Sequence, residues 1–320
     1  MNMKGNDFFR KYGIVLVLIL MIGFFSLTTE SFLTFNNLLN VIRQVSIMGI
    51  VAVGMTFVLL TGGLDLSVGA LLAVSGVSTS VLIVNYNVNP LLGMAVGVLV
   101  TTVLGMITGL IIQRIDLPPM IVTLGMMTIT RGLAYIITGG LPIYGLPKEY
   151  VKIGQGYIGV IPIPVIFMII IFLIGGFILN KTYFGRHFYA MGGNLEAARL
   201  SGVKVSSLKV VTYLISGFLC GIAGIILMFR INSGQPTAGL GIEMDVITAT
   251  VLGGVSLTGG EGKIFGVFIG CLIIGVLSNG LIIMNVGEYY QLIVKGMVLI
   301  LAVSFDKLGQ REKIKRVKVS

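Results

Sequence analysis

The sequence predicts an all-α protein, a polytopic transmembrane helical bundle of about ten spans with both termini in the cytoplasm. Three observations lead to this prediction. The 320 residues are 56% hydrophobic and only 11% charged, whereas soluble domains carry roughly 25% charged residues. Apolar runs recur along the whole chain, and its Lys and Arg residues gather between alternate runs. We therefore expect one membrane domain over residues 1–320, with its spans between 12 and 304 and no soluble catalytic domain.

The first half of the chain contains five apolar runs long enough to be candidate spans, each ended by charged, proline, asparagine or glycine residues. They cover residues 12–29, 44–61, 67–85, 91–112 and 119–138. The separating sequences are FLTFNN, TGGLD, NYNVNP and QRIDLPP. Such residues end spanning helices because the backbone must leave the apolar region there.

The second half contains five more runs of the same kind. They cover residues 160–179, 208–230, 244–257, 263–284 and 289–304. Some are shorter than the roughly 20 residues of a full span. Glycine-rich breaks that end a helix inside the protein would explain this. A model of eight spans with two re-entrant segments is the alternative, and it keeps both termini on the same side.

The basic residues set the orientation. With the N-terminus inside, the outside segments hold only Lys148, Lys152 and Arg230, and Arg43, Arg131 and Lys295 fall at or within spans. The inside segments hold Lys4, Arg10, Lys11, Arg114, Lys181, Arg186, Arg199, Lys204, Lys209, Lys263, Lys307, Arg311, Lys313, Lys315, Arg316 and Lys318. This asymmetry is typical of cytoplasmic loops. It predicts a basic cytoplasmic tail over 305–320 and explains the net charge of +10 without a nucleic-acid partner.

One short sequence occurs twice. LLTGGLDLSVGALLAV (59–74) and SLTGGEGKIFGVFIG (256–270) both place Thr-Gly-Gly at the end of an apolar run and before a new glycine-bearing run. Membrane carriers are often built from repeats with broken helices at the repeat interface. The echo is consistent with such a repeat, or with two similar turns.

Catalytic and cofactor motifs are not found. GGVSLTGGEGKIFG lacks the spacing of a phosphate loop, because Leu257 and Ile264 stand where Gly and Ser or Thr are needed. His187 is the only histidine, which excludes a multi-histidine metal site. A lipid-transferring membrane enzyme would need paired carboxylates or a nucleophile with its base, and the acidic residues are mostly isolated. We expect no metal, no cofactor and no enzymatic activity in this chain.

Four polar residues are candidates for a transport pathway, each with a structural alternative. Asp65 would cap the helix that begins at Leu66, or serve as an ion site. Gln235 belongs to INSGQPTAGLGIEMD (231–245), whose glycines and proline forbid a regular helix, so this backbone must be buried in protein or line water. Asn279 and Asn285 would bind a polar solute or hold helices together.

The least membrane-like passage of the chain is YAMGGNLEAARLSGVKVSSLK (189–209). Asn194 is a suitable N-cap, Glu196 suits the positive end of the helix dipole, and Gly202 suits the residue just past the helix end. A helix of about two turns is marginal alone in water, so it needs packing or a partner. The orientation places it in the cytoplasm, as a solvated linker or a docking helix.

This passage resembles the cytoplasmic coupling region of the ribose-type sugar permeases of ABC importers. The resemblance rests on GRHFYAMGGNLEAARLSGVKV and extends through GMTFVLLTGGLDLSVGALLAVSG, QPTAGLGIEMDVITATVLGGVSLTGGEGKIFGVFIG and LSNGLIIMNVGEYYQLIVKGMVLILAV. Together with FLTFNNLLNVIRQ, these motifs cover the chain from about residue 32 to 305. Several long motifs in the same order are more specific than any one of them.

The resemblance implies a multi-pass permease of the bacterial cytoplasmic (inner) membrane that imports a monosaccharide, D-ribose or a related sugar. A separate cytoplasmic ATPase would power it, and an extracytoplasmic sugar-binding protein would deliver the sugar. The permease would form a homodimer, or a heterodimer with a paralogue, surrounded by membrane lipid. Within a coupling segment over 185–207, a set of residues would sit in a groove of the ATPase: Gly193, Asn194, Glu196, Ala197, Ala198, Arg199, Leu200, Ser201 and Gly202.

The alternative function is an ion-coupled secondary transporter of a small polar solute. Such a carrier would be expected to hold an intramembrane acid or histidine relay. Asp65 is the main candidate for such an acid, and Asp245 is the other.

Overall fold

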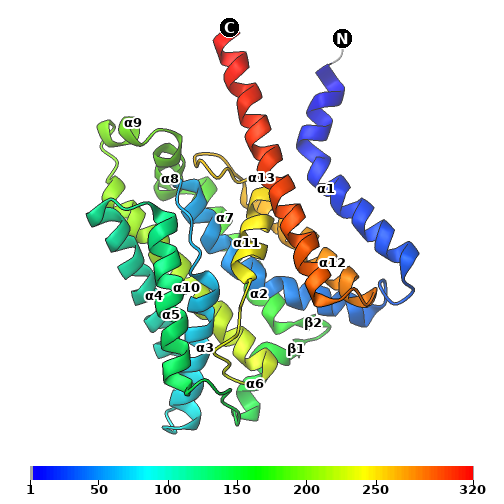
Figure 1. Cartoon of the computed structure of the whole chain (residues 1–320), viewed down its shortest axis with the longest axis vertical. Coiled ribbons are helices and arrows are strands. Elements are labelled where there is room, and N and C mark those ends of the chain that lie inside the picture. The colour runs from blue at the N-terminus through cyan, green and yellow to red at the C-terminus, as the bar shows by residue number, and fades with distance from the viewer. Residues whose placement is uncertain (1–2, 320) are drawn as a thin grey trace.

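The computed structural model describes residues 3–319, with side chains for 13–304, 306 and 307. Lys4, Arg10 and Lys11, and the basic residues beyond Lys307, are therefore outside the described side chains. Figure 1 shows a bundle of helices in which the start of α1 and the end of α13 lie at one end together with α9. This end is called the α9 end below. The opposite end carries α6 and the hairpin β1–β2, and is called the α6 end.

The elements of the described chain are helices and one two-stranded antiparallel hairpin. In order they are α1 (Met3–Thr28), α2 (Phe35–Leu60), α3 (Val68–Val84), α4 (Pro90–Ile115), α5 (Pro119–Thr138), α6 (Lys148–Gln155), β1 (Tyr157–Ile158), β2 (Ile161–Pro162), α7 (Ile163–Lys181), α8 (Tyr183–Gly193), α9 (Leu195–Leu200), α10 (Val205–Ile231), α11 (Ile242–Leu252), α12 (Ile264–Ile283) and α13 (Glu288–Val319).

Six of these helices are long and apolar enough to cross a membrane: α2, α4, α5, α7, α10 and α12. Two shorter apolar helices, Gly13–Thr28 and Val68–Val84, add to them within the part of the chain that the structure describes. The lipid-length helices carry many exposed large hydrophobic side chains, such as Leu92 on α4 and Leu173 on α7. These features confirm the predicted all-α membrane bundle.

The centre of the bundle is α10, which packs against α2, α3 and α4. The contact with α4 uses small residues at four-residue spacing on both helices, Gly105 and Gly109 on α4 and Gly217 and Gly221 on α10. A Cβ on Gly217 would meet the carbonyl oxygen of Thr101, and one on Gly105 would meet that of Tyr213. Such small-residue stripes let the backbones of membrane helices approach closely.

Two stretches of non-helical backbone interrupt the bundle, at residues 61–67 and 232–241. The first separates α2 from α3, and the second separates α10 from α11. Asp65 and Ser67 in the first stretch and Ser233 in the second are each at most 1% exposed. The expectation that the 231–245 backbone is non-helical is met for 232–241, in which Ser233, Gly234 and Pro236 are buried and Leu240 is exposed, and after which α11 begins.

Three expected boundaries need correction. The span expected over 244–257 is the helix α11, which has 11 residues and is about 16 Å long, about half of a membrane core. It stops at Leu252 because Gly253 and Gly254 follow, the latter at φ +82°. The span expected from 44 begins at Phe35, and Asn37 of its first turn is hydrogen-bonded to Asn279 of α12. The helix expected to start at Leu66 starts at Val68.

The close contact between α4 and α10 predicts that Gly217→Ala destabilises the protein. The added Cβ would collide with backbone of α4, which cannot move as a side-chain end can. We expect a loss of about 1–3 kcal/mol, measured as a lower thermal unfolding temperature of the detergent-solubilised protein.

The matched control is Gly125→Ala on α5, where a Cβ would meet nothing within 4 Å. It should leave the unfolding temperature unchanged or raise it, because alanine favours helix over glycine. Equal effects of the two substitutions would contradict the close α4–α10 contact.

Candidate functional site

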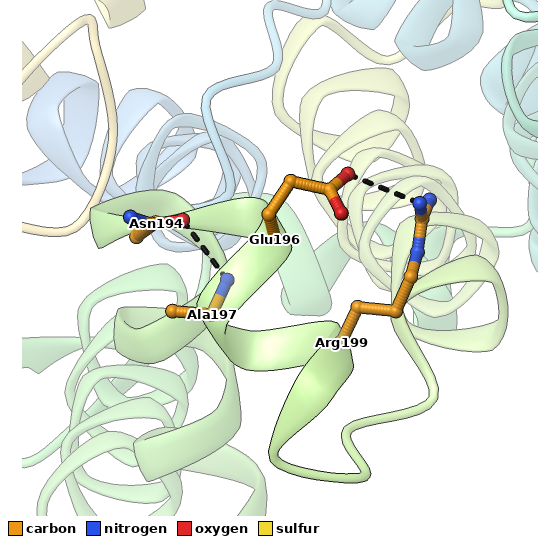
Figure 2. Close-up of polar contacts among 4 residues, drawn as sticks. All are labelled: Asn194, Glu196, Ala197 and Arg199. Atoms are coloured by element: carbon orange, nitrogen blue, oxygen red, sulfur yellow. Dashed lines mark hydrogen bonds and ion pairs between the residues drawn. The ribbon is translucent and has the colours of Figure 1, made fainter.

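The helix α9 has the N-terminal cap that the sequence predicts. The side-chain oxygen of Asn194 accepts a hydrogen bond from the backbone N–H of Ala197 at 3.0 Å, as Figure 2 shows. Asn194 itself has extended backbone and separates α9 from α8. In the next turn Glu196 pairs with Arg199 at 3.0 Å. Both side chains are more than half exposed, so this pair adds little stability and leaves both charges available to a partner.

The C-terminal end of α9 is closed by Gly202, at φ +82°. Its N–H donates to the carbonyl of Arg199 at 3.0 Å, and the N–H of Val203 donates to that of Ala198 at 3.1 Å. This pair of bonds is the Schellman arrangement, which needs a left-handed residue at the Gly202 position. A helix of 6 residues is thus fixed at both ends by its own sequence.

The two faces of α9 differ. Ala198 is buried at 4% exposure, and Leu195 is half-buried against the core of the protein. Leu200 is 87% exposed. The other residues expected to contact a partner are exposed as well: Gly193, Asn194, Glu196, Ala197, Arg199, Ser201 and Gly202. Ala198 alone of the expected set points inward, so its side chain holds the helix against the bundle.

A second helix, α8, precedes α9 and was not expected. The hydroxyl of Thr182 accepts from the N–H of Gly185 at 3.3 Å and caps it. Gly185, Phe188 and Met191 form its buried face. The sequence does contain a pattern typical of this helix, namely a capping threonine followed by residues at three-residue spacing that form the buried face. The glycines at 185, 192 and 193 obscure the pattern, because glycine disfavours helix.

The two repeated Thr-Gly-Gly turns lie side by side, and α8 ends on them. The N–H of Gly260 donates to the carbonyl of Leu60 at 2.9 Å. A Cβ on Gly259 would lie 2.8 Å from the backbone nitrogen of Gly62, and one on Gly192 would collide with Leu60 and Gly260. We call this contact of Leu60–Gly62, Gly259–Gly260 and Gly192–Gly193 the glycine junction. It joins α8 to the turn after α2 and to the turn before α12.

Two further contacts fasten α8 to the same elements. The ring of Phe188 packs edge-on against Phe57 of α2, with centroids 5.4 Å apart. The hydroxyl of Tyr189 donates to the carbonyl of Gly262 at 2.9 Å. Burial raises the pKa of this hydroxyl above its usual value, so it stays protonated and keeps donating. The pair of helices α8–α9 is therefore held rigidly to the bundle.

A cavity of about 300 Å³ lies between the glycine junction and the helices beside it. Its lining includes Asn194 and Leu195 at the start of α9, together with Lys209 and Tyr213 of α10. The α4–α5 connection closes it with Ile112 and Pro119. The start of α9 therefore borders open space on the side of Lys209 and Tyr213.

Asp65 is buried and fully hydrogen-bonded. One carboxylate oxygen accepts from the N–H and the hydroxyl of Ser67, at 3.0 and 2.6 Å. The other accepts from the hydroxyl of Ser216 on α10 at 2.7 Å. Tyr213 adds a bond from its hydroxyl to the carbonyl of Leu64 at 3.4 Å. Asp65 therefore joins the break between α2 and α3 to α10, and it lines neither described cavity.

The other pathway candidates have separate positions. Asn279 exchanges two hydrogen bonds of 2.9 Å with Asn37, which fits the reading that it holds α12 to α2. Asn285 is exposed in the turn after α12. Gln235 donates to the hydroxyl of Ser233 at 3.0 Å in the 232–241 stretch. The structure does not bring Asp65, Gln235, Asn279 and Asn285 together in one site.

Arg131 of α5 was not singled out as a site residue, and it stabilises the 232–241 backbone. Its guanidinium donates to the carbonyls of Pro236 and Ala238, at 2.7 and 2.8 Å. Glu243 lies close enough to interact with it electrostatically. Its position inside a predicted span indicates such a role, because an arginine at membrane depth needs carbonyl or acidic partners.

The family model described as "Branched-chain amino acid transport system / permease component" matches residues 37–303. The ribose import permease protein of Bacillus subtilis (strain 168) is 48% identical over 300 residues, 93% of each chain. That of Escherichia coli (strain K12) is 41% identical over 319 residues, covering 97% of this chain and 99% of the relative.

A relative named for another sugar is similar to nearly the same degree. The D-allose transport system permease protein of Escherichia coli (strain K12) is 40% identical over 303 residues, covering 94% of this chain and 93% of the relative. No solved structure matches the chain.

The glycine junction predicts that Gly192→Ala lowers stability. A Cβ at this position would collide with backbone atoms of both Thr-Gly-Gly turns, and we expect a loss of about 1–3 kcal/mol. Thermal unfolding of the solubilised protein measures it.

Gly193→Ala is the control, since a Cβ on the neighbouring residue would meet nothing within 4 Å. The junction would be disproved if Gly192→Ala and Gly193→Ala unfolded at the same temperature.

Proposed function

The chain belongs to the family of permease components of branched-chain amino acid transport systems. Within this family, we propose that it imports a monosaccharide, namely D-ribose or a related sugar. It is a membrane subunit of an ABC importer and not an enzyme. Relatives named as ribose import permeases match over more than nine-tenths of its length and support this assignment. Relatives named for allose and arabinose set the chemical class, a neutral monosaccharide.

The protein is a multi-pass component of the inner membrane. Its proposed topology has about ten crossings, with the α9 end in the cytoplasm. The 232–241 stretch and α11 together form one broken crossing, because α11 alone is about 16 Å long. The basic residues Arg186, Arg199 and Lys204 at the α9 end agree with a cytoplasmic location, and both termini share that end in Figure 1.

The proposed mechanism rests on one observation: the exposed, capped helix α9 follows α8, and α8 ends at the glycine junction. α9 sits in a groove of the cytoplasmic ATPase and presents Glu196, Arg199 and Leu200 to it. When nucleotide binding closes the ATPase, α9 is displaced. Because α8 ends on backbone, without flexible side chains in between, this displacement reaches the turns after α2 and before α12 as a rigid-body motion.

Two further partners complete the importer. A second permease copy, identical or a paralogue, forms the other half of the membrane unit, and lipid surrounds both. A sugar-binding protein docks at the α6 end, where Tyr157, Ile158 and Val160 of the hairpin region are exposed. Their exposure is consistent with a surface that a partner covers.

The surroundings of Asp65 argue against the alternative function, an ion-coupled secondary transporter. A proton or ion site at membrane depth is expected to include other ionisable groups or open ligand positions. Asp65 instead accepts bonds from Ser67 and Ser216, which are fixed parts of the fold.

The proposal predicts that sugar uptake needs all the components. Proteoliposomes that contain the permease, its ATPase, the binding protein and ATP should accumulate radiolabelled D-ribose. Omission of ATP or of the ATPase should abolish uptake. Uptake by the permease alone, driven by a proton or sodium gradient, would favour the ion-coupled alternative instead.

The docking role predicts that Arg199→Glu weakens the complex with the ATPase. Reversal of this exposed charge should lower the amount of ATPase that copurifies with the permease by about ten-fold, the effect of losing a charged hydrogen bond in the interface. Quantitative copurification measures it.

Lys152→Glu on α6 is the matched control, because it reverses an exposed charge at the opposite end of the molecule. It should copurify with the ATPase like the unchanged permease. If Arg199→Glu did the same, α9 would not be the docking helix.

A further inference from the structure

A second cavity, of about 240 Å³, lies between α2, α10, α11 and α12. Arg230 at the end of α10 and Asp245 in the first turn of α11 both line it. α10 ends on the α6 side of the bundle, where Gln155 of α6 donates a hydrogen bond to the carbonyl of Arg230. The cavity therefore lies in the half of the protein that faces away from α9, and it shares no lining residue with the cavity at the glycine junction.

Arg230 forms no ion pair with an acidic residue whose side chain the structure describes. Asp245, which lines the same cavity, pairs with Lys295 instead. Arg43, another cation, lies close enough to Arg230 to interact with it electrostatically, and its own Nε is buried without a hydrogen-bond partner. Arg230 is half-buried at the end of α10, and it lines the cavity. Its guanidinium is thus a donor group beside an open space and is not paired with a carboxylate of the described side chains.

The rest of the lining supplies complementary groups. Asp245 offers carboxylate oxygens and is held in place by Lys295 of α13 at 2.7 Å. Gln44 and Ser278 can both donate and accept. The remaining wall is apolar and includes Met48 and Ile274. A neutral polyol matches this lining, with its hydroxyls toward the polar groups and its C–H face toward the apolar wall.

We propose that this cavity is a transient monosaccharide subsite in the outer half of the permease, in which the guanidinium of Arg230 donates to sugar hydroxyls and Asp245 accepts from them. The assignment rests on the proposed function. The volume of about 240 Å³ is somewhat below the roughly 300 Å³ where pockets for drug-sized ligands begin, which suits a monosaccharide. Few direct contacts keep the binding weak, so that the sugar can leave inward.

The first test uses the assembled importer in proteoliposomes. Arg230→Gln should slow ribose uptake by about ten-fold, the effect of losing a charged hydrogen bond, and Arg230→Lys should fall between it and the unchanged protein. Lys307→Gln, which removes an exposed cation of α13 outside the cavity, is the control. Copurifying ATPase verifies that each variant folds. Uptake by Arg230→Gln equal to that by Lys307→Gln would overturn the subsite.

The second test does not depend on transport. Gln44→Cys, labelled with a charged, membrane-impermeant thiol reagent from the outside, should react, and ribose should slow the reaction whereas sucrose should not. The native Cys220 and Cys271 are fully buried and give the background. Labelling that ribose does not slow, or no labelling, would overturn the subsite. Failure of ribose uptake in the unchanged importer would instead overturn the proposed function.

Discussion

The constraint on which this structure depends is that backbone without helical hydrogen bonds cannot face lipid. The chain has two such stretches inside the bundle, 61–67 and 232–241, and polar side chains stabilise both. Asp65, with Ser67 and Ser216, holds the first, and the guanidinium of Arg131 binds the carbonyls of the second. Charged groups that would be costly at membrane depth are thereby explained as parts of the scaffold. Once they are assigned, Arg230 remains as a cation without an acidic partner among the described side chains.

The break at 61–67, together with the turn before α12, also gives the protein its means of transmitting motion. A continuous spanning helix would move as one rod, whereas a break provides a turn against which another element can push. The Thr-Gly-Gly turns after α2 and before α12 lie in backbone contact with each other and with the end of α8. Glycine is required there because a Cβ would not fit between the backbones. The short helix α9 is rigid through its own caps, and its attachment through α8 makes its position depend on these turns.

Much of this was predictable from the sequence, and the limits have physical causes. Composition and the spacing of apolar runs predict the membrane bundle, and local hydrogen-bonding residues predict α9, because Asn194 and Gly202 act within a few residues of themselves. The length of α11 follows from glycines that the sequence shows, although the apolar run continues to Leu257 and conceals the helix end. Contacts between distant segments were not predictable: the pairing of Asn37 with Asn279, the bonds of Arg131, and the meeting of the two Thr-Gly-Gly turns with α8.

The central claim is that α9 and the glycine junction move as one body when the ATPase closes. The distance between spin labels at Leu200→Cys and Thr258→Cys, both exposed positions, tests it in the assembled importer with and without ATP, using permease diluted with unlabelled copies. The account predicts one narrow distance distribution that is the same in both states. A distribution that shifts or broadens when ATP binds would show that α9 moves independently of the turns, and would contradict the account.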